Sequence, residues 1–88
     1  MKKGATKRTL IFDEAGLRAF ALHLKTIRTQ KNITQEDLAY KSGLALSQIA
    51  RIETARINPT LSTIFTIART LNIDLKELFD FELPEYSG

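Results

Sequence analysis

The stretch ALSQIARIE, residues 45–53, brings together an arginine, a glutamine and a serine, which are hydrogen-bonding groups rather than a catalytic set. Arg51 can donate two hydrogen bonds to guanine O6 and N7, the commonest specific contact in the DNA major groove. Gln48 and Ser47 can each bond to a base edge or to a phosphate. The alternative for Arg51 is a surface cation without a ligand.

These side chains need elements that hold them outward, and residues 34–53 supply the start and stop signals for two short helices. Thr34 is a helix N-cap type, and Asp37 three residues later makes a capping-box-like start. Gly43 suits the left-handed conformation of a sharp helix exit, where a residue with a β-carbon is strained. The pattern predicts two helices joined by a tight turn.

The apolar residues of the same stretch predict how the two helices pack. Ala39 is small, so the second helix can cross the first closely, and Ile49 and Ile52 recur at helical spacing. We therefore expect helices over 35–42 and about 45–54, with the second standing out from the surface and sized to enter a major groove.

Three further helices are expected around this pair. One runs from Glu14 to about Lys31 with Asp13 as its cap, another follows Thr60, and the last begins after Asp74. Their apolar faces, which we expect to be buried, are Leu17, Phe20, Leu24 and Ile27, then Leu61, Ile64, Ile67, Ala68 and Leu71, then Leu75, Leu78 and Phe79.

Together these residues resemble the helix-turn-helix of the Cro/phage-repressor-like family, also called Xre-type regulators, over about residues 18–80. The resemblance implies an all-α, five-helix, lambda-repressor-like DNA-binding domain. Besides the residues already named, it is carried by Arg28, by the runs 33–35 and 52–53, by Asn58-Pro59-Thr60-Leu61, and by the runs 67–73 and 74–79.

The resemblance also assigns base-reading positions on the second helix of the pair: Ala45, Leu46, Ser47, Gln48 and Arg51. None of them is needed for packing. Leu46 has two open roles, because it can meet a thymine methyl group or half-pack against the preceding helix.

Candidate phosphate contacts flank the base-reading positions. Gln35 begins a helix, where free backbone N–H groups and the helix dipole favour an anion, and the family uses a glutamine here against the DNA backbone. Thr54, Arg56 and Asn58 follow the second helix and could hold the opposite side of the groove. Lys41 is a weaker candidate.

Two further features come from the resemblance. The family often pairs a helix-1 arginine with a glutamate at the end of the recognition helix, which implies a structural ion pair between Arg28 and Glu53. The chain departs from the family pattern at Ala45, where Ser or Thr is common, and at Ala55, where Gly is common, so we expect a lost cap and a slightly different turn.

Composition limits the other functions. The 88 residues form one small domain with 43% hydrophobic residues, no cysteine and one histidine, His23, which we expect on the surface. No histidine–carboxylate pair, phosphate loop or metal cluster occurs, so we expect no enzyme activity, no cofactor and no small-molecule ligand. No apolar run approaches a membrane span or a signal peptide, so a cytoplasmic protein is expected.

The termini differ in charge. Residues 1–12 form a basic arm that carries +4 in its first eight positions, with Leu10–Phe12 as a candidate short strand for a small β pairing. The helix-turn-helix domain is placed at 13–80, and an apolar but acidic tail at 81–88. The arm can approach a polyanion or remain a solvated tail, and the tail can cover the core, pair with the strand or join a partner subunit.

The function expected from these features is a sequence-specific, DNA-binding transcriptional regulator that binds a palindromic operator in double-stranded DNA as a homodimer. The dimer is expected through the C-terminal end, because Leu75, Leu78, Phe79, Phe81, Leu83 and Tyr86 exceed what a small core needs. The alternative is a protein-interaction module, such as an antitoxin, that retains the fold.

Overall fold

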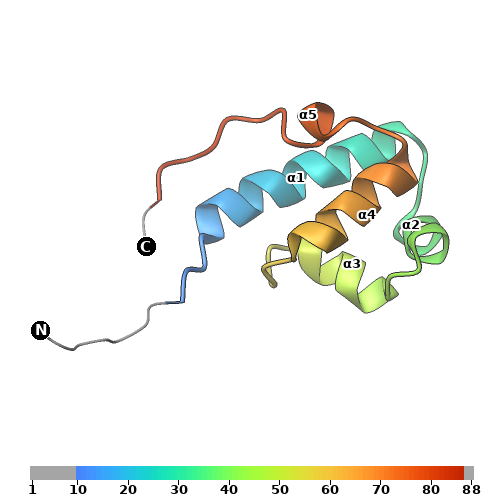
Figure 1. Cartoon of the computed structure of the whole chain (residues 1–88), viewed down its shortest axis with the longest axis horizontal. Helices are drawn as coiled ribbons and strands as arrows, with labels where there is room; N and C mark the ends of the chain where they lie inside the picture. The colour runs from blue at the N-terminus through green and yellow to red at the C-terminus, as the bar shows by residue number, and fades with distance from the viewer. Residues whose placement is uncertain (1–9, 87–88) are drawn as a thin grey trace, which may run out of the picture.

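The computed structural model describes residues 10–86, and within that range the chain is entirely helical. Five helices follow one another, namely α1 (Glu14–Gln30), α2 (Gln35–Ser42), α3 (Leu46–Glu53), α4 (Leu61–Leu71) and α5 (Leu75–Leu78) (Figure 1). Residues 10–86 contain no strand, so the expected pairing of Leu10–Phe12 with the tail of its own chain is wrong. A segment of three residues makes too few ladder bonds to be stable alone, and Leu10 is 93% exposed.

Side-chain caps fix where three of the helices begin. Asp13 accepts the Gly16 backbone N–H at 3.0 Å, and Thr60 accepts that of Thr63 at 3.2 Å. Thr34 and Asp37 form a complete capping box, with bonds of 3.0 and 3.1 Å in the two directions. The helix bounds therefore follow from the local sequence, as predicted for α1 and α2.

The other two helices begin without a side-chain cap. Ala45 occupies the N-cap of α3, so the lost cap expected from its departure is confirmed. Asp74 sits at the N-cap of α5 but its carboxylate makes no capping bond, contrary to expectation. Both helices depend on packing for their start.

Four helices end in a residue with left-handed backbone conformation: Asn32, Gly43, Ala55 and Asn72. Ala55 is the unusual one, with φ of +58°, and it closes α3 with the Arg56 N–H on the Arg51 carbonyl at 2.8 Å. We expected the turn to differ because a glycine is missing. Instead the alanine adopts the conformation that glycine takes more easily.

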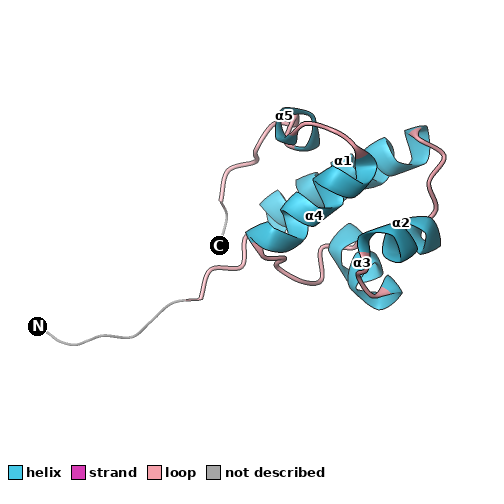
Figure 2. Ribbon diagram, turned by 45° about the vertical axis from the view of Figure 1, so that its right-hand side comes forward, coloured by secondary structure: helices cyan, strands magenta, loops and turns pink. Residues whose placement is uncertain are grey.

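The core joins all five helices. Its fully buried side chains are Leu24, Leu38, Ile49, Ile52, Ile67 and Leu78. In both views α2 lies at one end of the molecule, and the first and last described segments of the chain lie at the other end (Figures 1 and 2). These two segments therefore leave α2 uncovered.

Three apolar side chains, at the start of α4 and on and after α5, are more exposed than the sequence predicted. Leu61 is 67% exposed, and Leu75 and Phe79 are about half exposed, although all three were expected in the core. Part of the tail takes this place, because Phe81 packs against the core with its ring 6.2 Å from that of Phe20. The tail thus covers the core at Phe81 and leaves other apolar side chains outside.

His23 is partly exposed on α1, in agreement with the expected surface position, but its ring makes contacts with the C-terminal part of the chain. Its ring is half-buried, 5.5 Å from the ring of Phe81, and its Nε2 lies 2.7 Å from the Glu77 carbonyl oxygen. Because a carbonyl only accepts, Nε2 is the donor. This bond ties the end of α5 to α1.

The capping box of α2 gives a pH-dependent test. The backbone hydrogen bond from Thr34, and then the bond with its side chain, hold the pKa of Asp37 below its ordinary value. Stability from this carboxylate is therefore present above about pH 4 and is lost as pH falls through the depressed folded-state pKa. We expect Asp37→Asn to lower the thermal midpoint at neutral pH and to match the wild type in acid.

Circular dichroism melts of the two proteins across the acid range check this. A midpoint difference that stays constant down to about pH 2 would show that the carboxylate charge contributes nothing.

Candidate nucleic-acid interface

Helix α3 has one face in the core and one in solvent. Ile49 and Ile52 are buried, whereas Leu46, Ser47 and Arg51 are exposed. Gln48 is half-buried beside them, and Ala45 is exposed at the N-cap. The structure thus brings the five predicted base-reading positions onto the outward side and start of one short helix.

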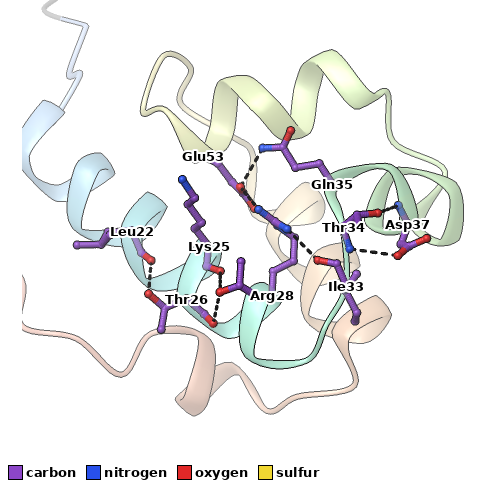
Figure 3. A network of polar contacts seen from close by, with 10 residues as sticks. Leu22, Lys25, Thr26, Arg28, Ile33, Thr34, Gln35, Asp37 and Glu53 are labelled. Atoms are coloured by element: carbon purple, nitrogen blue, oxygen red, sulfur yellow. Dashed lines mark hydrogen bonds and ion pairs between the residues drawn. The ribbon is translucent and has the colours of Figure 1, made fainter.

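The position of α3 is fixed by a buried ion pair at its last residue. Glu53 accepts Arg28 Nε on Oε2 at 2.6 Å and Arg28 Nη2 on Oε1 at 2.8 Å, which is a bidentate geometry (Figure 3). The Glu53 side chain is only 2% exposed. The pair expected from the family resemblance is therefore present, and it joins α1 to the end of α3.

The same pair organises the start of α2. Arg28 also donates from Nη1 to the Ile33 carbonyl at 2.8 Å, just before α2 begins. The hydrogen bond to Glu53, reinforced by its charge, raises the pKa of the Arg28 guanidinium, although burial acts in the opposite direction. Arg28 is therefore a fixed structural cation, and it is too buried to contact a phosphate.

Gln35 belongs to this network, which the sequence did not reveal. Its Nε2 donates to Glu53 Oε1 at 3.0 Å across a separation of 18 residues. A carboxylate only accepts, so the amide N–H₂ must face Glu53, and the amide oxygen points away from it (Figure 3). Gln35 therefore keeps one N–H and its oxygen for a ligand, next to the backbone N–H groups at the start of α2.

The other phosphate candidates lie on exposed segments at either side of α3. Lys41 is exposed on the last turn of α2, and Arg56 and Asn58 are exposed in the loop after α3. Thr54 differs, because its hydroxyl donates to the Ala50 carbonyl at 2.8 Å. A phosphate oxygen needs a donor, so Thr54 is the weakest of the set.

Other kinds of site find no support among residues 10–86. This part of the chain contains no group of three His, Cys, Asp or Glu side chains placed to hold a metal ion. None of its helices has the length and apolar character to cross a membrane.

The family model described as Helix-turn-helix (HTH_3) matches residues 24–78, from the middle of α1 to the end of α5. The chain belongs to this helix-turn-helix family.

Its relatives are transcriptional regulators. An uncharacterised HTH-type transcriptional regulator from Methanocaldococcus jannaschii is 37% identical over 62 residues, which is 70% of this chain and 94% of the relative. The restriction-modification controller protein C.AhdI from Aeromonas hydrophila is 38% identical, covers 72% of this chain and 96% of its own, and superposes with a TM-score of 0.69.

A second solved relative is described with its DNA. The controller protein C.Esp1396I, solved as a tetramer in complex with its natural 35 base-pair operator, is 36% identical to this chain. The match covers 73% of this chain and 84% of that one, with a TM-score of 0.69. The sequence-level identification of the family and of its five-helix fold is confirmed.

The buried pair predicts an asymmetric mutational response. Glu53→Ala should lower the free energy of unfolding by about 3–5 kcal/mol, because Arg28 is left buried without its counter-charge. Replacing both partners, by Arg28→Met with Glu53→Leu, should recover most of that loss, since no unpaired charge remains. Urea unfolding measures all three.

A matched control is the exposed ion pair on α1. Glu14→Ala breaks the 2.7 Å contact with Arg18, whose side chain is 68% exposed, and should change stability by only about 0.5 kcal/mol or less. Equal losses for Glu14→Ala and Glu53→Ala would contradict the special role of the buried pair.

Proposed function

We propose that this chain is a sequence-specific DNA-binding transcriptional regulator, which binds a palindromic operator as a homodimer with α3 in the major groove. The observation that carries the proposal is the outward face of α3, where groups able to read bases stand on a helix whose other face is locked into the core. A buried ion pair at the end of α3 adds the rigidity that base readout needs.

In this proposal each outward residue of α3 makes a different contact with the bases. Arg51 reads a guanine through its two donors, and Gln48 and Ser47 bond to neighbouring base edges. Leu46 contacts a thymine methyl group, which agrees with its partial exposure. Ala45 lies at the groove without a side-chain donor.

The phosphate contacts would lie on both sides of the groove. Gln35 and the start of α2 would hold one strand, with Lys41 near them, while Arg56 and Asn58 would hold the other. Thr54 would join only if its hydroxyl leaves the Ala50 carbonyl.

Two copies are required because one short helix contacts few base pairs. A two-fold dimer places two α3 helices about 34 Å apart, one turn of DNA, and matches a palindrome. The relatives come from an archaeon and a bacterium, whose DNA lies in the cytoplasm, so we place this protein there. The role is binding and not catalysis.

Arg51 gives the most direct test of base readout. Arg51→Ala should weaken binding to the specific operator by about 1–3 kcal/mol and relax the preference at one base pair, because a bidentate contact is lost. A gel shift against DNA flanking the protein's own gene finds the operator, and titration with single-base variants measures the preference.

The control is Arg69→Ala, which removes the same charge from an exposed position on α4. It should leave base preference unchanged. If Arg51→Ala weakened specific and random DNA equally, Arg51 would be a phosphate contact and not a base reader.

Arg56 gives a separate test of the phosphate contacts. Affinity should fall with salt in proportion to the number of phosphates neutralised, and Arg56→Ala should reduce the slope of log affinity against log salt by about one. Binding to specific and random DNA should weaken alike. An unchanged slope, measured by fluorescence anisotropy, would remove Arg56 from the interface.

A further inference from the structure

An apolar hollow of about 310 Å³ lies where the start of α1, the start of α4 and the C-terminal tail come together. Leu17 and Phe20 of α1, Ile64 of α4 and Phe81 of the tail are among the side chains that line it. This end of the molecule holds the first and last described segments of the chain and lies away from α2 (Figures 1 and 2). Of the residues that line it, Asn58 is also a proposed phosphate contact, and the others are not among the proposed DNA contacts.

Large apolar side chains stand exposed around this hollow. Ile11 is 67% exposed, Leu61 67% and Leu83 70%, and all three contribute to its walls. Leu10, the residue before Ile11, is 93% exposed. Exposed apolar side chains around an apolar hollow are typical of an interaction surface, because covering them removes apolar area from water.

We infer that a second copy of this chain covers the hollow, and that the Leu10–Phe12 segment, whose Ile11 also lines the hollow of its own copy, packs against the hollow of its partner. The inference rests on the homodimer of the proposed function and names its contact. Under two-fold symmetry each copy gives one segment and receives one, so the rim side chains and the hollows are buried together.

The amino-acid composition favours a second copy of the chain, and not the chain's own two ends, as the group that covers the hollow. The residues outside the described range are MKKGATKRT and SG, and they are too polar to fill an apolar hollow. The Leu10–Phe12 segment has the required apolar chemistry, and it is exposed and outside any helix.

Charge favours the same arrangement. Lys2, Lys3, Lys7 and Arg8 precede the segment in the sequence, while Glu77, Asp80, Glu82 and Glu85 lie on α5 and in the stretch after it, where Phe79, Phe81 and Leu83 line the hollow. Opposite charges on these two parts of the sequence favour the association of two copies. Dimerisation should therefore weaken as salt rises.

Charged substitutions at the rim test the face. Ile11→Glu and Leu83→Glu should each raise the dimer dissociation constant at least tenfold, since a charge would replace a buried side chain in both halves of the dimer. Leu22→Glu is the matched control, because Leu22 is 68% exposed on α1 but lies away from the hollow, and its dimer should be unchanged. Analytical ultracentrifugation measures association, and circular dichroism confirms that each variant is folded.

Disulfide trapping tests the contact between the Leu10–Phe12 segment and the partner's hollow. Since the sequence contains no cysteine, only the introduced cysteines can form a disulfide. One preparation carries Leu10→Cys and another Leu61→Cys, and the two are mixed and oxidised. A covalent heterodimer on a non-reducing gel supports the exchange. Mixing Leu10→Cys with Leu22→Cys should give none.

The outcomes separate this inference from the proposed function. A dimer that survives Ile11→Glu, or that gives no Leu10–Leu61 cross-link, overturns the exchanged segment and leaves DNA binding intact. A wild-type chain that stays monomeric at micromolar concentration, with and without operator DNA, removes the homodimer of the proposed function itself.

Discussion

The structure depends on one buried carboxylate. Glu53 ends α3 with a side chain that is 2% exposed, and such a charge is costly to bury unless it is paired and hydrogen-bonded. It accepts two bonds from Arg28 and one from Gln35, while Arg28 also holds the Ile33 carbonyl. The end of α1, the start of α2 and the end of α3 therefore meet at one point and cannot shift independently.

This constraint matters because α3 has little stability of its own. It is eight residues long, it starts at Ala45 without a side-chain cap, and it ends at Ala55 in a left-handed conformation that disfavours alanine. Tertiary contacts therefore hold the helix, namely Ile49 and Ile52 in the core and Glu53 in the ion pair. The outward residues take no part in this, so they can vary with the ligand while the helix stays in place.

Local signals made most of the fold predictable from the sequence. The capping box at Thr34 and the left-handed exit at Gly43 set the bounds of α2, and both are confirmed. Spacing predicts which side of a helix is apolar, but it cannot say whether another segment covers that side. Leu61 and Phe79 were therefore placed wrongly, because the path of the tail decides their burial.

The resemblance gave the Arg28–Glu53 pair, but two other bonds between distant residues were beyond sequence reasoning for a related reason. His23 meets Glu77 across 54 residues, and Gln35 meets Glu53 across 18, and neither pair leaves a periodic signal. Gln35 shows the consequence for the site. Its residue type suggested a free phosphate ligand, whereas the structure shows an amide already oriented by Glu53.

The molecule presents two surfaces of opposite chemistry, and its rigid core relates them. The polar face of α3 offers hydrogen bonds, and the apolar hollow beside Leu61 offers only burial. In the proposed dimer the polar face of α3 reads one half-site, and the apolar hollow joins the two copies. The distance between the two half-sites is then set by the core that packs α3 against the hollow, and not by either surface alone. The Arg28–Glu53 pair lies within that packing, where it holds α3 against α1. A change in the core that tilts α3 would therefore alter the spacing of the operator without touching a base-reading residue.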